Sequence, residues 1–110
     1  MTISLKQKTG LHHDLIKQIV ATILIHVGAK KIIIYGSRAR GNFRQTSDID
    51  IAVESYKDSN NDVNILNEIL NEEIPTLLKC EVINLNKVGA KLRNEVLLEG
   101  IVIYEKISAN

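Results

Sequence analysis

Three consecutive isoleucines, Ile32 to Ile34, restrict the possible folds of this chain more than any other feature. They lie within the run Lys31–Tyr35, whose β-branched and aromatic side chains favour a strand. Because successive side chains of a strand point to opposite faces, an unbroken apolar run predicts a strand that is buried on both faces. Such a strand needs a covering layer on each side of its sheet, which favours an α/β domain with helices flanking the sheet.

The rest of the chain supplies helical and strand patterns in alternation. Helices are predicted where apolar residues recur at helical spacing, namely over 11–27, 63–74 and 87–98, with a short helix after Gly36. Strands are predicted where β-branched residues cluster or alternate with polar ones, namely over 31–35, 48–53, 78–85 and 101–104. Polar connections are expected at 42–47 and 56–62. This order predicts one α/β (α+β) domain over residues 1–110, built on a small mixed sheet.

The bulk composition narrows the classes of function. With 110 residues the chain suits one domain, and its 45% hydrophobic and 25% charged residues are an ordinary globular mixture. A net charge of +1 provides no basic field, so we expect no direct nucleic-acid partner. Cys80 is the only cysteine, which excludes an intrachain disulfide. The polar start of the chain and its short apolar stretches predict a soluble, cytoplasmic protein with no membrane partner.

A pair of aspartates is the strongest indication of chemistry. Asp48 and Asp50 occupy positions i and i+2 of a predicted strand, so both carboxylates leave the same face. Neighbouring like charges destabilise a fold by about 0.2–1 kcal/mol, and partial burial raises that cost. A divalent cation that prefers oxygen ligands turns this repulsion into attraction. The alternative is a solvated polar strand face that carries two acids by chance.

The strand 31–35 ends in Gly36-Ser37, which predicts a phosphate cradle. N–H groups at the start of a helix attract an anion, and a glycine lets a phosphate approach the backbone closely. The Ser37 hydroxyl can donate to a phosphate oxygen, and Arg38 and Arg40 can add charge-assisted contacts. The alternative is an ordinary strand-to-helix turn in which Ser37 caps the helix.

A third acid, Glu81, follows in the predicted strand 78–85. If this strand pairs beside the one that bears Asp48, Glu81 could reach the same point, while alternation turns Cys80 to the buried face. Three carboxylates would suit two metal ions about 3.5–4 Å apart, which clamp the attacking and leaving oxygens of a phosphoryl displacement. The alternative for Glu81 is a solvent-facing strand residue.

The motif Gly36-Ser37, ten residues, and then Asp48-Ile49-Asp50 resembles the signature of the polymerase-beta-like nucleotidyltransferase superfamily. The longer text GSRARGNFRQTSDIDIAV is similar to the minimal nucleotidyltransferase domain of prokaryotes. The resemblance extends to the preceding amphipathic helix, to the strand that carries the third acid and to the closing strand. It implies the nucleotidyltransferase fold over nearly the whole chain.

The resemblance also implies a role for each motif residue. Gly36 and Ser37 would hold the β- and γ-phosphates of a nucleoside triphosphate, with ATP as the expected substrate. Asp48 and Asp50 would ligate two Mg²⁺ ions, with Glu81 as a third ligand beside the attacking hydroxyl. The family more often has aspartate at this third position, so Glu81 is a departure that adds one methylene group and shifts the carboxylate.

Minimal domains of this family commonly stand beside a HEPN-type protein, a small helical ribonuclease toxin. The resemblance therefore implies a catalytic antitoxin that transfers NMP, namely AMP from ATP, to a tyrosine hydroxyl of such a partner. A homo-oligomer or a hetero-oligomer would follow from that role. Two alternatives stay open at this point. One is a non-catalytic antitoxin that neutralises its partner by complex formation, and the other is a nucleotide sensor that acts in a homodimer.

Overall fold

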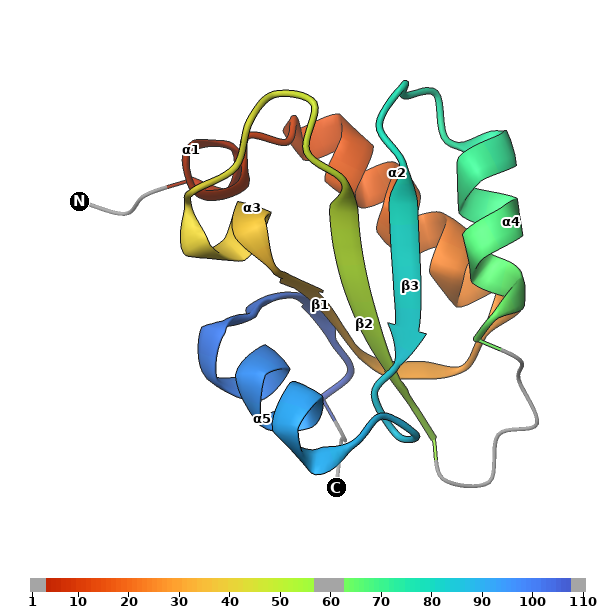
Figure 1. Ribbon diagram of the computed structural model, residues 1–110. Helices are drawn as coiled ribbons and strands as arrows, with labels where there is room; N and C mark the ends of the chain where they lie inside the picture. Colours follow the sequence, from red (N-terminus) through yellow and green to blue (C-terminus); the bar gives the residue numbers. More distant parts are fainter. Residues whose placement is uncertain (1–3, 57–62, 108–110) are drawn as a thin grey trace.

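The computed structural model describes residues 4–56 and 63–107 (Figure 1). The helices and strands in these ranges are α1 (Leu5–Thr9), α2 (His13–His26), β1 (Ala29–Tyr35), α3 (Ser37–Arg40), β2 (Ile49–Ser55), α4 (Ile65–Glu73), β3 (Cys80–Asn84), α5 (Ala90–Glu99) and β4 (Ile101–Glu105). All the predicted helices and strands are present in the predicted order. The polar connection predicted at 56–62 lies, apart from Tyr56, outside the described residues. None of the helices in the described ranges is long and apolar enough to cross a bilayer.

The four strands form one mixed sheet in the order β3-β2-β1-β4. β1 pairs antiparallel with β2 and with β4, whereas β2 and β3 are parallel. A parallel pair needs a crossover connection, which α4 supplies. Helices α2 and α4 cover one face of the sheet and α5 covers part of the other (Figure 1). This arrangement confirms the predicted mixed sheet with flanking helices.

The isoleucine run in β1 is buried on both faces, as predicted. Ile32 and Ile34 belong to the larger core cluster beneath α2 and α4, whereas Ile33 packs in a smaller cluster beneath α5. None of the three is more than 2% exposed. Because full burial of such a side chain contributes about 1.5–3 kcal/mol, the two layers hold β1 at the centre of the sheet.

The second face of β2 is more buried than its alternating pattern predicted. Ala52 lies on the same face as Asp50, yet it is fully buried because α5 packs over it through Val96. The polar character of this face comes from Asp50 and Glu54, which lie on either side of the covered residue. The prediction of a half-buried strand was therefore wrong for the middle of β2, since alternation within a strand does not reveal a helix that arrives later in the chain.

Helix α1 was not predicted, because its five residues show no apolar periodicity. It begins after Ser4, whose hydroxyl accepts from the Gln7 N–H, while the Gln7 side chain accepts from the Ser4 N–H. This reciprocal pair is a capping box, and its spacing is visible in the sequence. The helix ends at Gly10, where φ is 70°, and the turn directs the Thr9 carbonyl toward α3.

Candidate active site

Three neighbouring strands place a row of polar side chains on the sheet face that α5 partly covers. Tyr35 of β1 pairs with Asp50 of β2, and Asp50 pairs with Glu81 of β3. Asp48 lies two residues before Asp50, immediately before β2 begins at Ile49. The strand pairing on which the expected role of Glu81 depends is therefore present.

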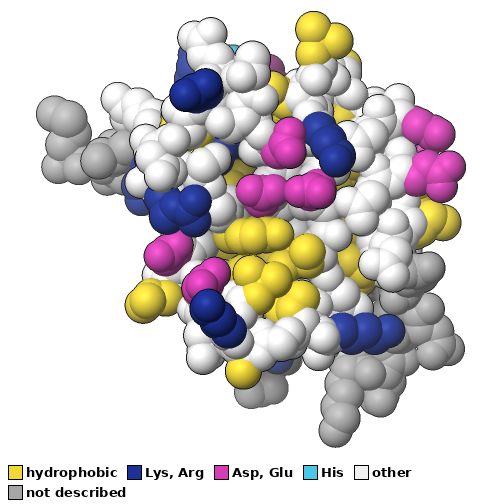
Figure 2. Space-filling view, in the orientation of Figure 1, with side chains coloured by type: hydrophobic (Ala, Val, Ile, Leu, Met, Phe, Trp, Pro, Cys, Tyr) yellow, Lys and Arg dark blue, Asp and Glu magenta, His cyan; other side chains and the backbone are white. Residues whose placement is uncertain are grey.

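We call Asp48, Asp50 and Glu81 the acid row. An apolar row lies next to it on the same face. Two residues further along the strands, the row consists of Ile33, Ala52 and Ile83. These side chains pack in or against the cluster beneath α5. In Figure 2 acidic side chains accordingly lie beside a hydrophobic patch near the centre of the view. The acid row itself stays accessible, since the Glu81 side chain is 53% exposed.

Gly36 joins β1 to α3 in a backbone conformation that favours glycine. Its φ is 74° and its ψ is −151°. A side chain here would also collide with the acid row, because an added Cβ would meet Oδ2 of Asp50. Ser37, the next residue, begins α3 and is partly exposed. The turn and the second aspartate of the motif are thus brought together, as the phosphate-and-metal hypothesis requires.

Crowding of the acids changes the titration of Asp50. Burial raises the pKa of this carboxyl above its ordinary value of 3.8, and Coulomb repulsion from Glu81 and Asp48 raises it further. Arg40 lowers the same pKa, so its positive charge acts on the acid row. The fold therefore holds carboxylates together at an electrostatic cost that a bound cation would relieve.

Tyr35 is a member of this site that the sequence patterns missed, since its strand position indicated packing alone. It does pack against the smaller core cluster. Burial together with the charges of Asp50 and Glu81 also raises the pKa of its phenol to about 12. The hydroxyl therefore stays protonated at neutral pH and can donate a hydrogen bond toward the acids or a ligand. Its position directly before Gly36 of the motif could have indicated that Tyr35 belongs to the site.

The acid row offers oxygen ligands, which suit Mg²⁺. Among residues 4–56 and 63–107, no three His, Cys, Asp or Glu side chains form a ready-made cation cage. Mg²⁺ does not require one, because one or two carboxylates usually hold it while substrate phosphates and water complete its coordination. Asp48 and Asp50 beside the Gly36 turn fit that pattern. Glu81 lies in register with Asp50 and forms an exposed ion pair, with its Oε1 3.7 Å from Lys79 Nζ.

Arg38 has a structural role, contrary to its predicted role as a phosphate ligand. Its side chain is 1% exposed, and burial lowers the pKa of the guanidinium. The guanidinium lies 5.0 Å from the centre of the Phe43 ring. It donates hydrogen bonds of 2.8–3.4 Å to the backbone carbonyls of Thr9, Arg44, Gln45 and Ser47. These bonds tie α1 and the connection 41–47 to α3 and direct the donors away from a phosphate.

Arg40, the other predicted phosphate ligand, has an exposed side chain. Its Nη1 lies 3.5 Å from Oε2 of Glu99 at the end of α5, and both side chains are more than 40% exposed. An exposed ion pair of this kind contributes little to stability, so it opposes reorientation only weakly. Arg40 therefore stays a candidate for a phosphate contact beside the acid row.

Cys80 is a core residue, as predicted from alternation along its strand. It is 1% exposed and belongs to the larger core cluster. Burial and the nearby charge of Asp48 raise the pKa of its thiol to about 11. The thiol is thus protonated at neutral pH and has no nucleophilic part in this site.

Comparison with known proteins agrees with this geometry. Residues 7–108 match the family described as Polymerase beta, Nucleotidyltransferase. The chain belongs to this family. The matched range includes the Gly36 turn and all three acids of the row, so the resemblance stated from the sequence is confirmed.

Individual relatives share parts of the sequence and the fold. This chain is 32% identical to "Putative protein adenylyltransferase MJ0604" of Methanocaldococcus jannaschii over 78 residues. The aligned residues cover 68% of this chain and 78% of the relative. A crystal structure of a toxin–antitoxin with AMP-PNP contains a chain that matches with a TM-score of 0.70 at 20% identity, over 83% of this chain and 73% of that chain. A structure of the tri-AMPylated Shewanella oneidensis HEPN toxin in complex with MNT antitoxin contains a chain that matches with a TM-score of 0.62 at 18% identity. The match covers 87% of this chain and 74% of that chain. At these identities the two structures establish the fold.

Proposed function

We propose that this nucleotidyltransferase transfers AMP from ATP to a tyrosine hydroxyl of a HEPN-type toxin and so acts as an antitoxin. One observation carries the proposal: Asp50 lies directly against the turn at Gly36 and in register with Glu81 on the neighbouring strand. The relatives support the choice of acceptor. One is named as a protein adenylyltransferase, and a chain of similar fold occurs in a structure with a tri-AMPylated HEPN toxin.

In this proposal the Gly36 turn holds the β- and γ-phosphates of ATP. The missing side chain of Gly36 leaves room for the Asp50 carboxylate beside the turn, and the N–H groups that begin α3 are donors for phosphate oxygens. The hydroxyl of Ser37 can donate a further hydrogen bond. Arg40 can leave its exposed pair with Glu99 and add a charge-assisted contact. The presence of AMP-PNP in a structure of similar fold supports an adenine nucleotide.

Asp48 and Asp50 would hold Mg²⁺, with two ions expected and Glu81 as the third carboxylate. When bound, Mg²⁺ neutralises the charge that develops on the phosphate oxygens during displacement. The chain's own contribution is to fix the carboxylates beside the turn. The repulsion that raises the pKa of Asp50 is the cost of that arrangement in the absence of a cation.

The proposed step is an in-line displacement at the α-phosphorus. The tyrosine oxygen forms a bond to the α-phosphorus as the bond from that phosphorus to the bridging oxygen breaks, and pyrophosphate leaves. The hydroxyl proton passes to the carboxylate of Glu81 or of Asp48. Glu81 is open to an incoming acceptor, because its side chain is 53% exposed.

Transfer of label from ATP tests this proposal. The protein is incubated with Mg²⁺, the product of the gene adjacent to its own, and ATP that is labelled at either the α- or the γ-phosphate. The proposal predicts α-label, and no γ-label, on a tyrosine of the partner. A folded partner that acquires no α-label would contradict the proposal, and γ-label would indicate phosphorylation instead.

A non-catalytic antitoxin, which neutralises its partner by complex formation alone, is the second candidate. The observation in its favour concerns the third acid: Glu81 pairs with Lys79, and the described part of the chain holds no ready-made cage of three ligands. The double variant Asp48→Asn/Asp50→Asn separates the candidates. It would still neutralise the toxin if complex formation were sufficient, and it would fail to do so if AMP transfer were required.

A further inference from the structure

Two asparagines of α4 complete the edge of the sheet at β3. Within the described part of the chain β3 is an edge strand, and no strand there lies beside the N–H and C=O groups of Cys80 and Val82. The Asn71 amide binds both groups of Cys80, donating to its carbonyl at 2.9 Å and accepting from its N–H at 2.9 Å. The Asn67 amide does the same for Val82, at 3.1 Å and 2.7 Å. Four hydrogen bonds thus replace those of a fifth strand.

The spacing of the two asparagines matches the spacing of the strand groups. Residues i and i+4 of a helix are about 6 Å apart along its axis. Residues i and i+2 of a strand are about 6.7 Å apart. Asn67 and Asn71 can therefore bind alternate residues of β3 simultaneously, and the order of the contacts shows that α4 runs antiparallel to β3.

Glu81 is the residue between the two clamped positions. On the other edge of β3, the neighbouring Lys79 carbonyl accepts from the Ile49 N–H at 2.8 Å. The backbone that carries Glu81 is thus fixed from both sides, and Glu81 lies in register with Asp50. A fixed backbone limits the positions that the Glu81 carboxylate can reach.

We propose that Asn67 and Asn71 are positioning residues that hold Glu81 beside Asp50 for metal binding. The inference rests on the proposed function, which assigns a metal to the acid row. Neither asparagine touches the nucleotide or the metal in this account. Both act through the backbone of β3, so their loss changes the placement of Glu81 while every carboxylate of the row is retained.

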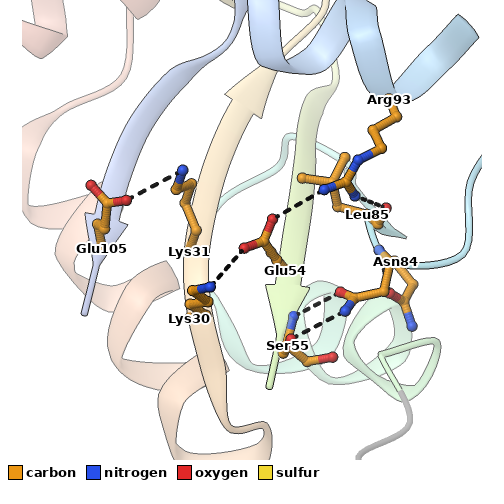
Figure 3. A network of polar contacts seen from close by, with 9 residues as sticks. Lys30, Lys31, Glu54, Ser55, Asn84, Leu85, Arg93 and Glu105 are labelled. Atoms are coloured by element: carbon orange, nitrogen blue, oxygen red, sulfur yellow. Dashed lines mark hydrogen bonds and ion pairs between the residues drawn. The ribbon is translucent and has the colours of Figure 1, made fainter. Parts of the chain in front are cut away.

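The double variant Asn67→Ala/Asn71→Ala tests the inference, and Asn86 provides a matched control. The Asn86 amide clamps Ser55 in the same manner, accepting from its N–H at 2.9 Å and donating to its carbonyl at 3.2 Å. Figure 3 shows Ser55 next to Glu54. Ser55 is the last residue of β2 and Asp50 is the second, so the two lie at opposite ends of the strand. Asn86→Ala therefore removes the same pair of hydrogen bonds far from the acid row. The single variants Asn67→Ala and Asn71→Ala serve where the double variant does not fold.

Metal binding is measured with Mn²⁺ in place of Mg²⁺, in the presence of a non-hydrolysable ATP analogue, from the electron paramagnetic resonance signal of free Mn²⁺. Loss of residues that orient metal ligands weakens affinity by about 10–100-fold. We expect at least about a 10-fold loss for Asn67→Ala/Asn71→Ala and no measurable loss for Asn86→Ala. Amide exchange confirms the cause if the N–H groups of Cys80 and Val82 lose protection in the double variant. AMP transfer should then recover at high Mg²⁺, because all three carboxylates remain.

The outcomes separate this inference from the proposed function. Wild-type Mn²⁺ affinity in a double variant whose Cys80 and Val82 amides exchange freely would overturn the inference alone. An equal loss in Asn86→Ala would also overturn it, since the effect would then be general destabilisation. A wild-type protein that binds no Mn²⁺ would contradict the metal site and the inference with it. The wild type could instead bind Mn²⁺ without transferring AMP, while Asn67→Ala/Asn71→Ala loses Mn²⁺ affinity and Asn86→Ala does not. That result would support the inference and contradict only the catalytic proposal.

Discussion

At the scale of single residues, the site depends on a close approach between Gly36 and Asp50. The glycine has a φ of 74°, and the space of its missing Cβ is filled by the Asp50 carboxylate. Gly41, four residues after Ser37, has a similar φ of 87° but no heavy atom within 4 Å of a built Cβ. A substitution at Gly41 therefore tests backbone strain alone, whereas a substitution at Gly36 tests backbone strain together with contact with the acid row.

Alanine at each glycine gives the first prediction. Gly41 is in the left-handed region, where a residue with a Cβ costs about 1–2 kcal/mol, so Gly41→Ala should lower the free energy of unfolding by about that amount. Gly36, with a ψ of −151°, is in a region that is nearly exclusive to glycine, so Gly36→Ala should cost about 1–3 kcal/mol. Only Gly36→Ala should abolish AMP transfer, because only its Cβ displaces Asp50. Urea unfolding and label transfer measure the two effects. Equal activity of both variants would show that the close approach has no part in function.

Asp50 gives a prediction about pH. Its pKa is raised in the folded state, so the folded chain binds this proton more tightly than the unfolded chain, and ionisation of Asp50 lowers stability. The penalty is absent below the unfolded value near 3.8 and complete above the raised folded value. In metal-free buffer at pH 8, the free energy of unfolding of Asp50→Asn should therefore exceed that of the wild type by up to about 1 kcal/mol, and its Tm should be correspondingly higher. The difference should vanish as the pH falls below 4, and a gain that persists there would contradict this cause.

The sequence could indicate the acids but not the surroundings of every site residue. Asp48 and Asp50 share a face because the side-chain period of a strand is fixed, and this holds before any fold is known. The role of Arg38 was not predictable in the same way. Its acceptors are backbone carbonyls from two separate segments, 9 and 44–47. Because every residue has a backbone carbonyl, the sequence does not reveal which carbonyls accept.

At the scale of elements, α3 is a single turn that other parts of the chain must hold. Four residues form too few hydrogen bonds for a helix to be stable alone. The Arg38 side chain supplies the anchor, because it joins α3 to α1 and to the connection 41–47. The position of the Gly36 turn therefore depends on a buried charge and its carbonyl partners.

Arg38→Lys should destabilise this part of the fold. Lysine keeps the charge but cannot reproduce the planar fork, so several carbonyls lose a charged donor, at about 1.5–3 kcal/mol for each such bond. We expect a loss of at least about 2 kcal/mol in the free energy of unfolding, together with weaker ATP binding. Arg40→Lys, at an exposed position, is the control and should leave stability nearly unchanged. Equal stability of the two variants would contradict the anchoring role of Arg38.

The elements that the sequence predicted well are those with a long periodic pattern. The wide apolar stripe of α2 and the isoleucines of β1 both correspond to buried faces in the structure. The errors occurred where a pattern is short or where a distant element decides burial. Helix α1 has five residues and a capping box, and the face of β2 at Ala52 is covered by α5 from nearly forty residues later.

At the scale of the whole molecule, the sheet has one face covered by α2 and α4 and another that α5 covers only in part (Figure 1). The acid row lies on the partly covered face, beside the hydrophobic patch seen in Figure 2. An acceptor on a second protein could therefore reach the acids without displacing the core. The proposed transfer to a partner protein would therefore take place on this face.

Ligand binding should stabilise the entire domain through this site. A ligand at 100 times its Kd stabilises the folded state by about 2.7 kcal/mol, provided that it does not bind the unfolded chain. Mg²⁺ with a non-hydrolysable ATP analogue should thus raise the Tm of the wild type, and EDTA should reverse the rise. Asp48→Asn/Asp50→Asn should show no such shift in thermal unfolding. An equal rise in this variant would mean that the nucleotide binds elsewhere.

The most direct test of the central claim is the mass of the partner protein after incubation with ATP and Mg²⁺. The wild-type chain should add one or more AMP groups to the partner, and Asp48→Asn/Asp50→Asn should add none, although it remains folded. A partner of unchanged mass after incubation with the wild type, or an equal number of AMP groups added by the double variant, would contradict the assignment of the acid row as the active site.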